Sequence, residues 1–336
     1  MARIFMTGLE AGHVSVFDIV VAATISSAVK RSGAYSLHVA DYSRHAGAYL
    51  PASTELYLRL GVYPTGGTAE RVFLSLGDGS WCQLQFYTPS GGFAPIRVNR
   101  GIHRETFLAE GGILAAPAWN CVEVYAKIHP SEGRVSVKVD GVEVIDFTGN
   151  TKGSGTYIDR FFVGANPYGG SVDKQKTLWG YYDDIAVNNT TGTEHNSWPG
   201  VGGIFPVLVD GAGSHAEFTP SAGDNYACVD ERPPNDDTDY VESDIVGTKD
   251  AYSIDASGLP SGLVTAVQWV ARGKLSIAGY GALAPLLRHG GVNYEGTPQG
   301  LGVSYAMSQV IFEQAPDATP WTVAKVTALE AGAVVR

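Results

Sequence analysis

The sequence predicts an all-β protein in which an antiparallel sandwich precedes a smaller β-rich domain. Short alternations of apolar and polar residues recur about every ten residues, as in a chain of strands and turns. Almost no stretch shows the period of an amphipathic helix. The 336 residues include 42 glycines and 17 prolines without a collagen period, which is typical of a protein with many turns.

The clearest strands lie between Trp119 and Phe147. Residues 122–128, 135–139 and 142–147 each alternate apolar and polar side chains, so each is expected to be a half-buried strand. The last two are separated by Asp140-Gly141, a dipeptide that favours the type I′ turn of a hairpin. Three adjacent strands with one apolar face need a second sheet to cover that face.

The other elements of the first half follow in chain order. Strands are expected at residues 4–6, 35–39 after a turn, 49–50, 56–62, 72–76, 81–87, 95–98, 106–108, 157–164 and 180–187. Gly, Asp and Ser residues stand between most of them, which fits a sandwich built of short strands.

This pattern resembles the laminin-G-like, concanavalin A-like jelly-roll domains. The resemblance rests on Trp119 opening a strand, on the Asp140-Gly141 turn, and on Gly180–Val187, whose Asp183-Asp184-Ile185 is similar to the family's last strand. It covers roughly residues 1–190 and implies that residues 4–6 pair with residues 184–187. Because this sandwich hosts lectins, adhesins, hydrolases and structural modules, it implies a fold and leaves the function open.

The second half is expected to be a separate β-rich domain. Residues 188–203 are rich in Asn, Thr, Gly, Ser and Pro, so we expect a first domain over 1–190, a linker over 191–203 and a second domain over 204–336. Strands are expected at 205–209, 251–254, 263–271, 284–287, 304–312 and 333–335, with a long acidic loop over 226–244. Pro320 near position N1 predicts a short helix over 323–329.

The second half also resembles structural proteins of tailed bacteriophages and prophages. The resemblance lies in the closing segment 314–332 and in the loop 228–234. It implies a virion component made in a bacterial cytoplasm and released by lysis, either a tail fibre or adhesion protein or a capsid decoration protein. Other virion proteins would be its partners, and a homo-oligomer is expected, with a trimer favoured. The N-terminus lacks a signal-peptide pattern, which disfavours the third hypothesis, a free carbohydrate-binding module.

Charge argues against nucleic acid and membranes as partners. The net charge is −11, and residues 204–336 carry 7 Lys/Arg against 16 Asp/Glu, a net of −9. An acidic chain lacks the basic footprint of a DNA-binding protein. The apolar run 19–25 is too short to span a bilayer. Of the three cysteines, Cys82 and Cys121 are expected to be small buried hydrophobes, and their pairing is left open.

Enzyme motifs are missing, so a non-enzymatic protein is expected. The sequence has no Gly-x-Ser-x-Gly, no His-Glu-x-x-His and no phosphate-binding glycine loop. It also lacks the paired carboxylates of the glucanases that share the sandwich fold. Glu123 and Glu143 lie on the polar sides of their strands and are expected to face solvent.

Two acidic groups invite a metal hypothesis. By strand alternation Asp183 shares the inward face of Ile185 and Val187, and a buried carboxylate needs a partner. Hydrogen bonds from backbone amides near the N-terminus are the favoured interpretation, and Ca²⁺ held by Asp183 and Asp184 is the alternative. For the loop carboxylates at 236, 237 and 239, solvation is favoured over cation binding.

A host-surface glycan is the one small ligand that the sequence suggests. Arg97, Arg100 and Arg104, with His103, form a basic cluster that suits an anionic glycan, although a charged strand edge that blocks aggregation explains it equally well. Tyr168 lies in a Gly-rich loop and is the favoured exposed aromatic. The other aromatic residues of this region could stack on sugars, and core packing accounts for about half of them: Tyr157, Trp179, Tyr181 and Tyr182.

Overall fold

The chain folds into two compact units. The computed structural model describes residues 2–40, 44–65, 71–79, 81–89, 94–101, 106–164 and 179–336. The first unit comprises the residues up to Leu9 together with Phe17–Ile204, and the second comprises Glu10–Val16 and Phe205–Arg336. The expected linker 191–203 therefore belongs to the first unit, and a short N-terminal segment belongs to the second.

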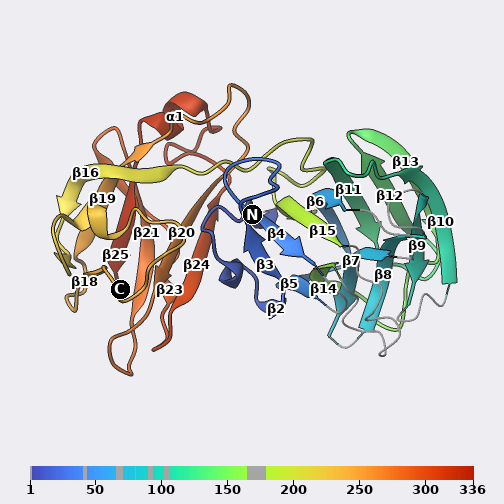
Figure 1. The fold of residues 1–336 in the computed structure, drawn as a ribbon, viewed down its shortest axis with the longest axis horizontal. Coiled ribbons are helices and arrows are strands. Elements are labelled where there is room, and N and C mark those ends of the chain that lie inside the picture. Colours follow the sequence, from blue (N-terminus) through green and yellow to red (C-terminus); the bar gives the residue numbers. More distant parts are fainter. Residues whose placement is uncertain are drawn as a thin grey trace. The chain divides into compact units, whose positions relative to one another are not determined.

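Two large antiparallel sheets form a sandwich in the first unit (Figure 1). In the described residues, one sheet has eight strands: β13 (Val142–Gly149), β12 (Gly133–Val139), β11 (Asn120–Lys127), β6 (Glu55–Pro64), β15 (Gly180–Asn189), β4 (Ser36–Val39) and β3 (Thr24–Ser26), with β1 (Arg3–Thr7) also on β15. The other has seven: β10 (Thr106–Ile113), β9 (Pro95–Arg100), β8 (Trp81–Thr88), β7 (Arg71–Asp78), β14 (Ile158–Gly164), β5 (His45–Ser53) and β2 (Ile19–Val21). The predicted all-β class is confirmed.

Alternation along the strands fills the space between these sheets. Leu58 on β6 pairs with Val124 on β11, and both side chains are fully buried. Their neighbours Tyr57 and Tyr125 point to the outer face. Each fully buried aliphatic side chain contributes roughly 1.5–3 kcal/mol, so the many positions of this kind hold the two sheets together.

Local turn chemistry behaves as predicted at the β12–β13 hairpin. Asp140 and Gly141 both have positive φ, 50° and 83°, which is the signature of a type I′ turn. The predicted pairing of the first strand with the last is also confirmed, because Phe5 lies opposite Val187. β2 and β3 were not predicted, since three residues are too few to show an alternation.

The second unit has a curled six-stranded sheet. Its strands are β16 (Leu208–Ala216), β19 (Lys249–Asp255), β25 (Glu330–Val335), β21 (Ala282–His289) and β22 (Val292–Glu295), with β23 (Gln299–Gly300) also on β21. Two-stranded pairs are β17 (Thr219–Pro220) with β18 (Val241–Glu242), and β20 (Val267–Gly273) with β24 (Ala306–Phe312). His215 on β16 lies within 3.3 Å of Asn293 on β22, so side chains join the two edges of the curled sheet.

Trp321 organises the core of the second unit. It is almost fully buried with Leu287, Val326 and Leu329, and its indole N–H donates to the Phe312 carbonyl at 2.8 Å.

Helices are few and short. The only described α-helix is α1 (Val323–Thr327), and two 3₁₀ turns cover Val14–Val16 and Asn225–Cys228. No helix among the described residues is long and apolar enough to cross a membrane.

Some boundaries in the second unit differ from the prediction. Thr322 is the N-cap of α1 and accepts a hydrogen bond from Lys325 N, so Pro320 lies before the cap and not at N1. The strand expected at 205–209 runs from Leu208 to Ala216, because glycines at 211 and 213 hide its alternation. Cysteines 82, 121 and 228, which all lie in the described residues, are buried, and no disulfide joins them.

Candidate functional site

A β-bulge in β15 rearranges the Asp183-Asp184 pair. Asp184 has a φ of +52°, and the register of β15 against β6 shifts between Asp183 and Ala186. Asp183 lies opposite Gly61, on the outer face, whereas Val187 lies opposite the buried Leu58. The prediction that Asp183 shares the inward face of Ile185 and Val187 is therefore wrong, because the bulge reverses the alternation.

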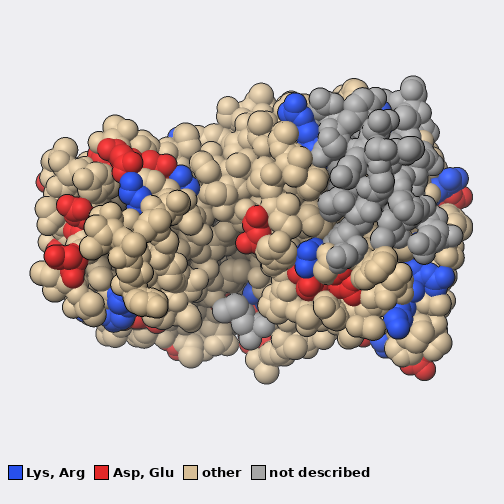
Figure 2. Space-filling view, turned by 90° about the horizontal axis from the view of Figure 1, so that it is seen from below, with Lys and Arg blue, Asp and Glu red and all other residues tan. Residues whose placement is uncertain are grey.

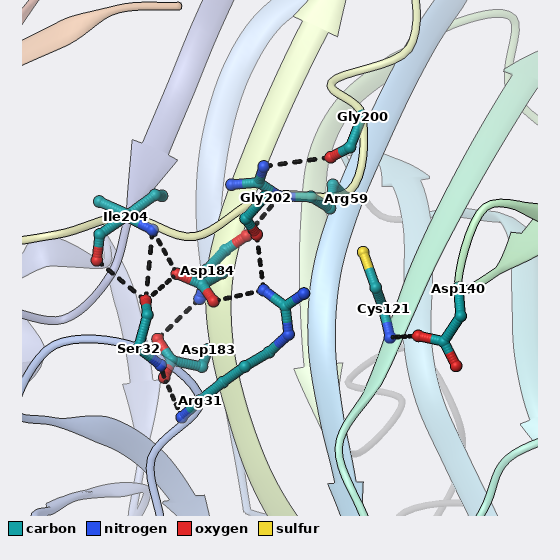
Figure 3. Close-up of polar contacts among 10 residues, drawn as sticks. All are labelled: Arg31, Ser32, Arg59, Cys121, Asp140, Asp183, Asp184, Gly200, Gly202 and Ile204. Carbon is teal, nitrogen blue, oxygen red and sulfur yellow. Dashed lines mark hydrogen bonds and ion pairs between the residues drawn. The ribbon is translucent and has the colours of Figure 1, made fainter. Parts of the chain in front are cut away.

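Both carboxylates are nevertheless fully buried, since other segments cover them (Figure 3). Asp183 accepts hydrogen bonds from the backbone N–H groups of Arg31, at 2.9 Å, and of Asp184, at 2.7 Å. Asp184 pairs with the Arg31 guanidinium at 2.6 Å, and accepts from the Ser32 hydroxyl and from Ile204 N at the same distance. The favoured backbone-amide interpretation thus describes Asp183, with donors at residues 31, 32 and 184.

The same network holds the segment after β15 against the sheet. Arg59 donates to the carbonyls of Asp184 and Gly200, and Arg31 donates to the carbonyl of Gly202 (Figure 3). Glu123 accepts from Gly200 N at 2.7 Å. Glu123 is only 2% exposed, so the expectation that it faces solvent is wrong. We call residues 197–204 the docked segment, and its contacts explain why it is not a free linker.

Burial disfavours the charged forms of Asp183 and Arg59, and hydrogen bonds offset part of that cost. Burial and then the neighbouring charge of Asp184 raise the pKa of Asp183, and the backbone N–H donors oppose that rise. Burial lowers the pKa of Arg59. Protein donors contact both carboxylates, and no group of three His, Cys, Asp or Glu side chains in the described ranges could hold a metal ion. The arrangement is suited to fixing a segment.

The predicted basic cluster is divided between two faces. Arg97 and Arg100 are three residues apart on β9, where they pair with Tyr87 and Leu84. Because side chains alternate along a strand, the two arginines point to opposite faces of the sheet. Arg97 pairs with Glu110 at 2.8 Å, and Arg100 donates to Thr106 at 3.0 Å. Arg104, His103 and Tyr168 lie outside the described residues.

The other sequence candidates have partners within their own units. Tyr182 is fully buried in the core, and Tyr181 stacks on His38 with ring centroids 4.5 Å apart. In the second unit, Asp236 pairs with Arg272 and Asp237 with Lys274. Glu143 is exposed, as expected, and accepts from the Ser136 hydroxyl. On the face seen in Figure 2, described charges of both signs are scattered among uncharged residues.

A different cluster, which the sequence analysis missed, occupies the outer face of the eight-stranded sheet. Tyr57 and Tyr125 lie opposite each other on β6 and β11, and their rings stack at 4.7 Å. Trp198 of the docked segment packs against Tyr57 edge-on at 5.3 Å. Lys138 places its ammonium 4.0 Å from the centre of the Trp198 ring. We call Tyr57, Tyr125, Trp198 and Lys138 the aromatic patch.

The patch combines partly exposed ring faces with polar groups. Tyr125 donates its hydroxyl to Glu55 at 3.2 Å, and Lys127 lies 3.7 Å from the same carboxylate. Burial and then Glu55 raise the pKa of Tyr125 to about 12, so this phenol stays a neutral donor at physiological pH. Ring faces beside a hydroxyl, a carboxylate and an ammonium can bind a ligand that has both apolar and hydroxylated surfaces.

The missed patch had only a weak signal in the sequence. Positions 57 and 125 are aromatic residues on the polar sides of their strands, where a solvent-facing ring is a possible binding residue. The register that places these two residues opposite each other depends on how the strands pair, so it cannot be read from either strand alone. Trp198 lay in a segment expected to be a linker, so nothing connected it to them.

The chain is similar to several solved structures at low sequence identity. No protein-family model matches the sequence, and no curated protein matches it. Similar solved structures include the alginate lyase Aly36B, at 15% identity over 58% of this chain and 95% of that chain, with a TM-score of 0.35. Domain 4 of AbnA, an extracellular arabinanase from Geobacillus stearothermophilus, is 13% identical over 56% of this chain and 93% of that chain, with a TM-score of 0.38.

A SAP-like pentraxin from Limulus polyphemus is also similar. It is 16% identical over 43% of this chain and 68% of that chain, with a TM-score of 0.32. These proteins include enzymes and a non-enzyme, and no residue role is transferred from them. The sheet topology of the first unit itself establishes an antiparallel β-sandwich of two large sheets.

Proposed function

We propose that this chain is a non-enzymatic attachment protein whose first unit binds a glycan at the aromatic patch. The observation that carries the proposal is the juxtaposition of Tyr57, Tyr125 and Trp198 on the outer face of a rigid sheet. A pyranose ring has an apolar face of C–H groups and an edge of hydroxyl groups. Aromatic faces suit the first, and the Glu55 carboxylate and Lys138 ammonium suit the second.

The patch is better suited to holding a ligand than to cleaving one. The Glu55 carboxylate is already engaged by two neighbours, since it accepts from the Tyr125 hydroxyl and lies 3.7 Å from the Lys127 ammonium. Of the two carboxylates weighed for catalysis in the sequence, Glu123 is buried beneath the docked segment and Glu143 is exposed and accepts from the Ser136 hydroxyl. These contacts support a binding role without chemistry.

Placement on a tailed-phage particle is part of the same proposal. It rests on the resemblance of segment 314–332 and loop 228–234 to phage structural proteins. None of the structures named above is described as a phage protein, so this placement has sequence support alone. The protein would be displayed on the virion surface, with its second unit attached to neighbouring virion proteins.

Glycan binding is tested on an array of bacterial surface polysaccharides, followed by calorimetry with any polysaccharide that binds. We expect Trp198→Ala to weaken binding by about tenfold to a hundredfold, because losing the apolar contact of one large aromatic side chain costs roughly 1.5–3 kcal/mol. Trp81→Ala is the matched control, since Trp81 is 47% exposed on the other sheet. Circular dichroism verifies that both variants fold. Absence of binding by the wild type, or equal losses in both variants, would reject the proposal.

The virion placement is tested on purified particles with a labelled antibody. Label on the tail, together with poorer host adsorption by particles that carry Trp198→Ala, is the expected result. Label on the head with unchanged adsorption would replace attachment by capsid decoration. Unlabelled particles and a purified protein that still binds glycan would favour a free carbohydrate-binding module.

A further inference from the structure

Two buried side chains hold the backbone of Gly200 in the docked segment. The Glu123 carboxylate accepts from Gly200 N at 2.7 Å, and the Arg59 guanidinium donates to the Gly200 carbonyl at 3.2 Å. Both side chains are almost fully buried. Gly200 has a φ of +79°, a conformation that favours glycine. The path of the chain at this point is therefore fixed by hydrogen bonds to its peptide groups.

Trp198 lies between Gly200 and a second fixed point at Ser197. The Asn188 side-chain amide donates to the Ser197 carbonyl at 2.7 Å, and Asn188 is fully buried. The backbone is thus held one residue before Trp198 and two residues after it. Because the indole is restricted in advance, it loses less conformational entropy when a ligand binds to it.

The residues that hold the docked segment lie beside the tyrosines of the aromatic patch. Tyr57 on β6 lies opposite Tyr125 on β11, and Asn188 on β15 lies opposite Tyr57. Two residues further along the same two strands, Arg59 lies opposite Glu123. Residues two apart on a strand share a face. Each of β6 and β11 therefore supplies one ring of the patch and one group that holds Gly200.

We propose that Arg59, Glu123 and Asn188 are positioning residues of the glycan site, and that docking of residues 197–204 is coupled to glycan binding. This inference rests on the proposed function. Trp198 is the one ring of the patch that does not come from a strand, so it joins the tyrosines only when the segment is docked. A glycan that contacts Trp198 then binds the docked state more tightly than the undocked state. The coupling is mutual: loosening the segment weakens binding, and bound glycan stabilises the docked segment.

Hydrogen exchange of the full-length wild type tests the coupling, with the bacterial surface polysaccharide that binds most tightly on the array as the probe. At saturating polysaccharide, peptides that cover residues 199–204 are expected to exchange about tenfold to a hundredfold more slowly. This is the factor by which Trp198→Ala is expected to weaken binding, since linkage makes the two factors equal. Peptides of β19 in the second unit are the control, and their exchange should be unchanged.

Variants of Glu123 test the positioning role by calorimetry. Glu123→Ala leaves the buried Gly200 N–H without its acceptor, so we expect about tenfold weaker binding. Glu123→Gln keeps a carbonyl oxygen that accepts from Gly200 N and is expected to recover most of the affinity. In the Trp198→Ala background, Glu123→Ala should cause no further loss, because a positioning residue acts on the glycan only through Trp198. Circular dichroism verifies that each variant folds.

The outcomes separate this inference from the proposed function. If a polysaccharide binds but leaves the exchange of residues 199–204 unchanged, the coupling is overturned and glycan binding stands. Wild-type affinity in Glu123→Ala, or equal losses from that substitution with and without Trp198, would also overturn it. A wild type that binds no polysaccharide would reject the aromatic patch as a glycan site, and this inference with it. The exchange measurement uses the wild type, so it decides even where Glu123→Ala does not fold.

Discussion

Removal of the Asp184 carboxylate is expected to release the docked segment. Asp184→Ala deletes the ion pair to Arg31 and the bonds from the Ser32 hydroxyl and Ile204 N, all at 2.6 Å. Removing one partner of a buried ion pair costs about 3–5 kcal/mol. Alanine at a φ of +52° adds about 1–2 kcal/mol. Arg31 keeps the Gly202 carbonyl as an acceptor, so we expect a loss of about 4 kcal/mol.

Asp184→Asn removes the charge of residue 184 while keeping nearly the same side-chain shape. Asparagine tolerates positive φ, and its carbonyl oxygen still accepts from Ser32 and Ile204. Its NH₂ group then faces the Arg31 guanidinium in place of a carboxylate oxygen, so the ion pair and its hydrogen bond are both lost. We expect about 2 kcal/mol for this variant. Because the chain has two units and need not unfold in one step, hydrogen exchange of peptides that cover residues 199–204 is the appropriate measurement. A loss of about 2 kcal/mol in local opening corresponds to roughly thirtyfold faster exchange.

The control for these variants is Asp146→Asn. Asp146 pairs with Arg134 on the same sheet, but both side chains are 45% exposed, and such pairs contribute about 0–1 kcal/mol. Exchange of residues 199–204 should be unchanged in this control. If Asp184→Ala left that exchange at the wild-type rate, or if Asp146→Asn accelerated it equally, the account of the docked segment would be wrong.

Three further predictions follow from the same structure. The pKa of Asp183 is raised in the folded state. The free energy of unfolding is therefore expected to be highest below the usual aspartate pKa and to fall as the pH rises toward the folded-state pKa. Unfolding midpoints of Asp183→Asn, measured over the same pH range, should lack this fall. Gly332→Ala should destabilise the second unit by about 3 kcal/mol in denaturant titrations, since its Cβ would lie 1.9 Å from the Asp250 carbonyl oxygen. Limited proteolysis with mass spectrometry should cut first within the mostly exposed residues 190–196; early cuts at 199–204 would contradict the docking.

Several features of the fold were predictable because their causes are local. Side-chain alternation marked β6, β11 and β12, since a half-buried strand imposes a period of two on its own residues. The Asp140-Gly141 turn was predictable because two positive φ values favour those residue types. The pairing of residues 4–6 with β15 was also predicted correctly. That prediction came from the family resemblance and not from the local pattern.

The candidate site depended on tertiary structure. The outward position of Asp183 follows from a bulge, which is a property of how β15 pairs with β6 and leaves no mark on the alternation of β15 itself. Glu123 is buried because a segment about 77 positions later in the chain binds it. Tyr57, Tyr125 and Trp198 meet through the register of two strands and the docking of a third segment. The sequence alone thus predicted where the strands with clear alternation lie, although not β2 or β3. Contacts between distant segments decided which side chains share a surface, because burial depends on the partner and not on the strand alone.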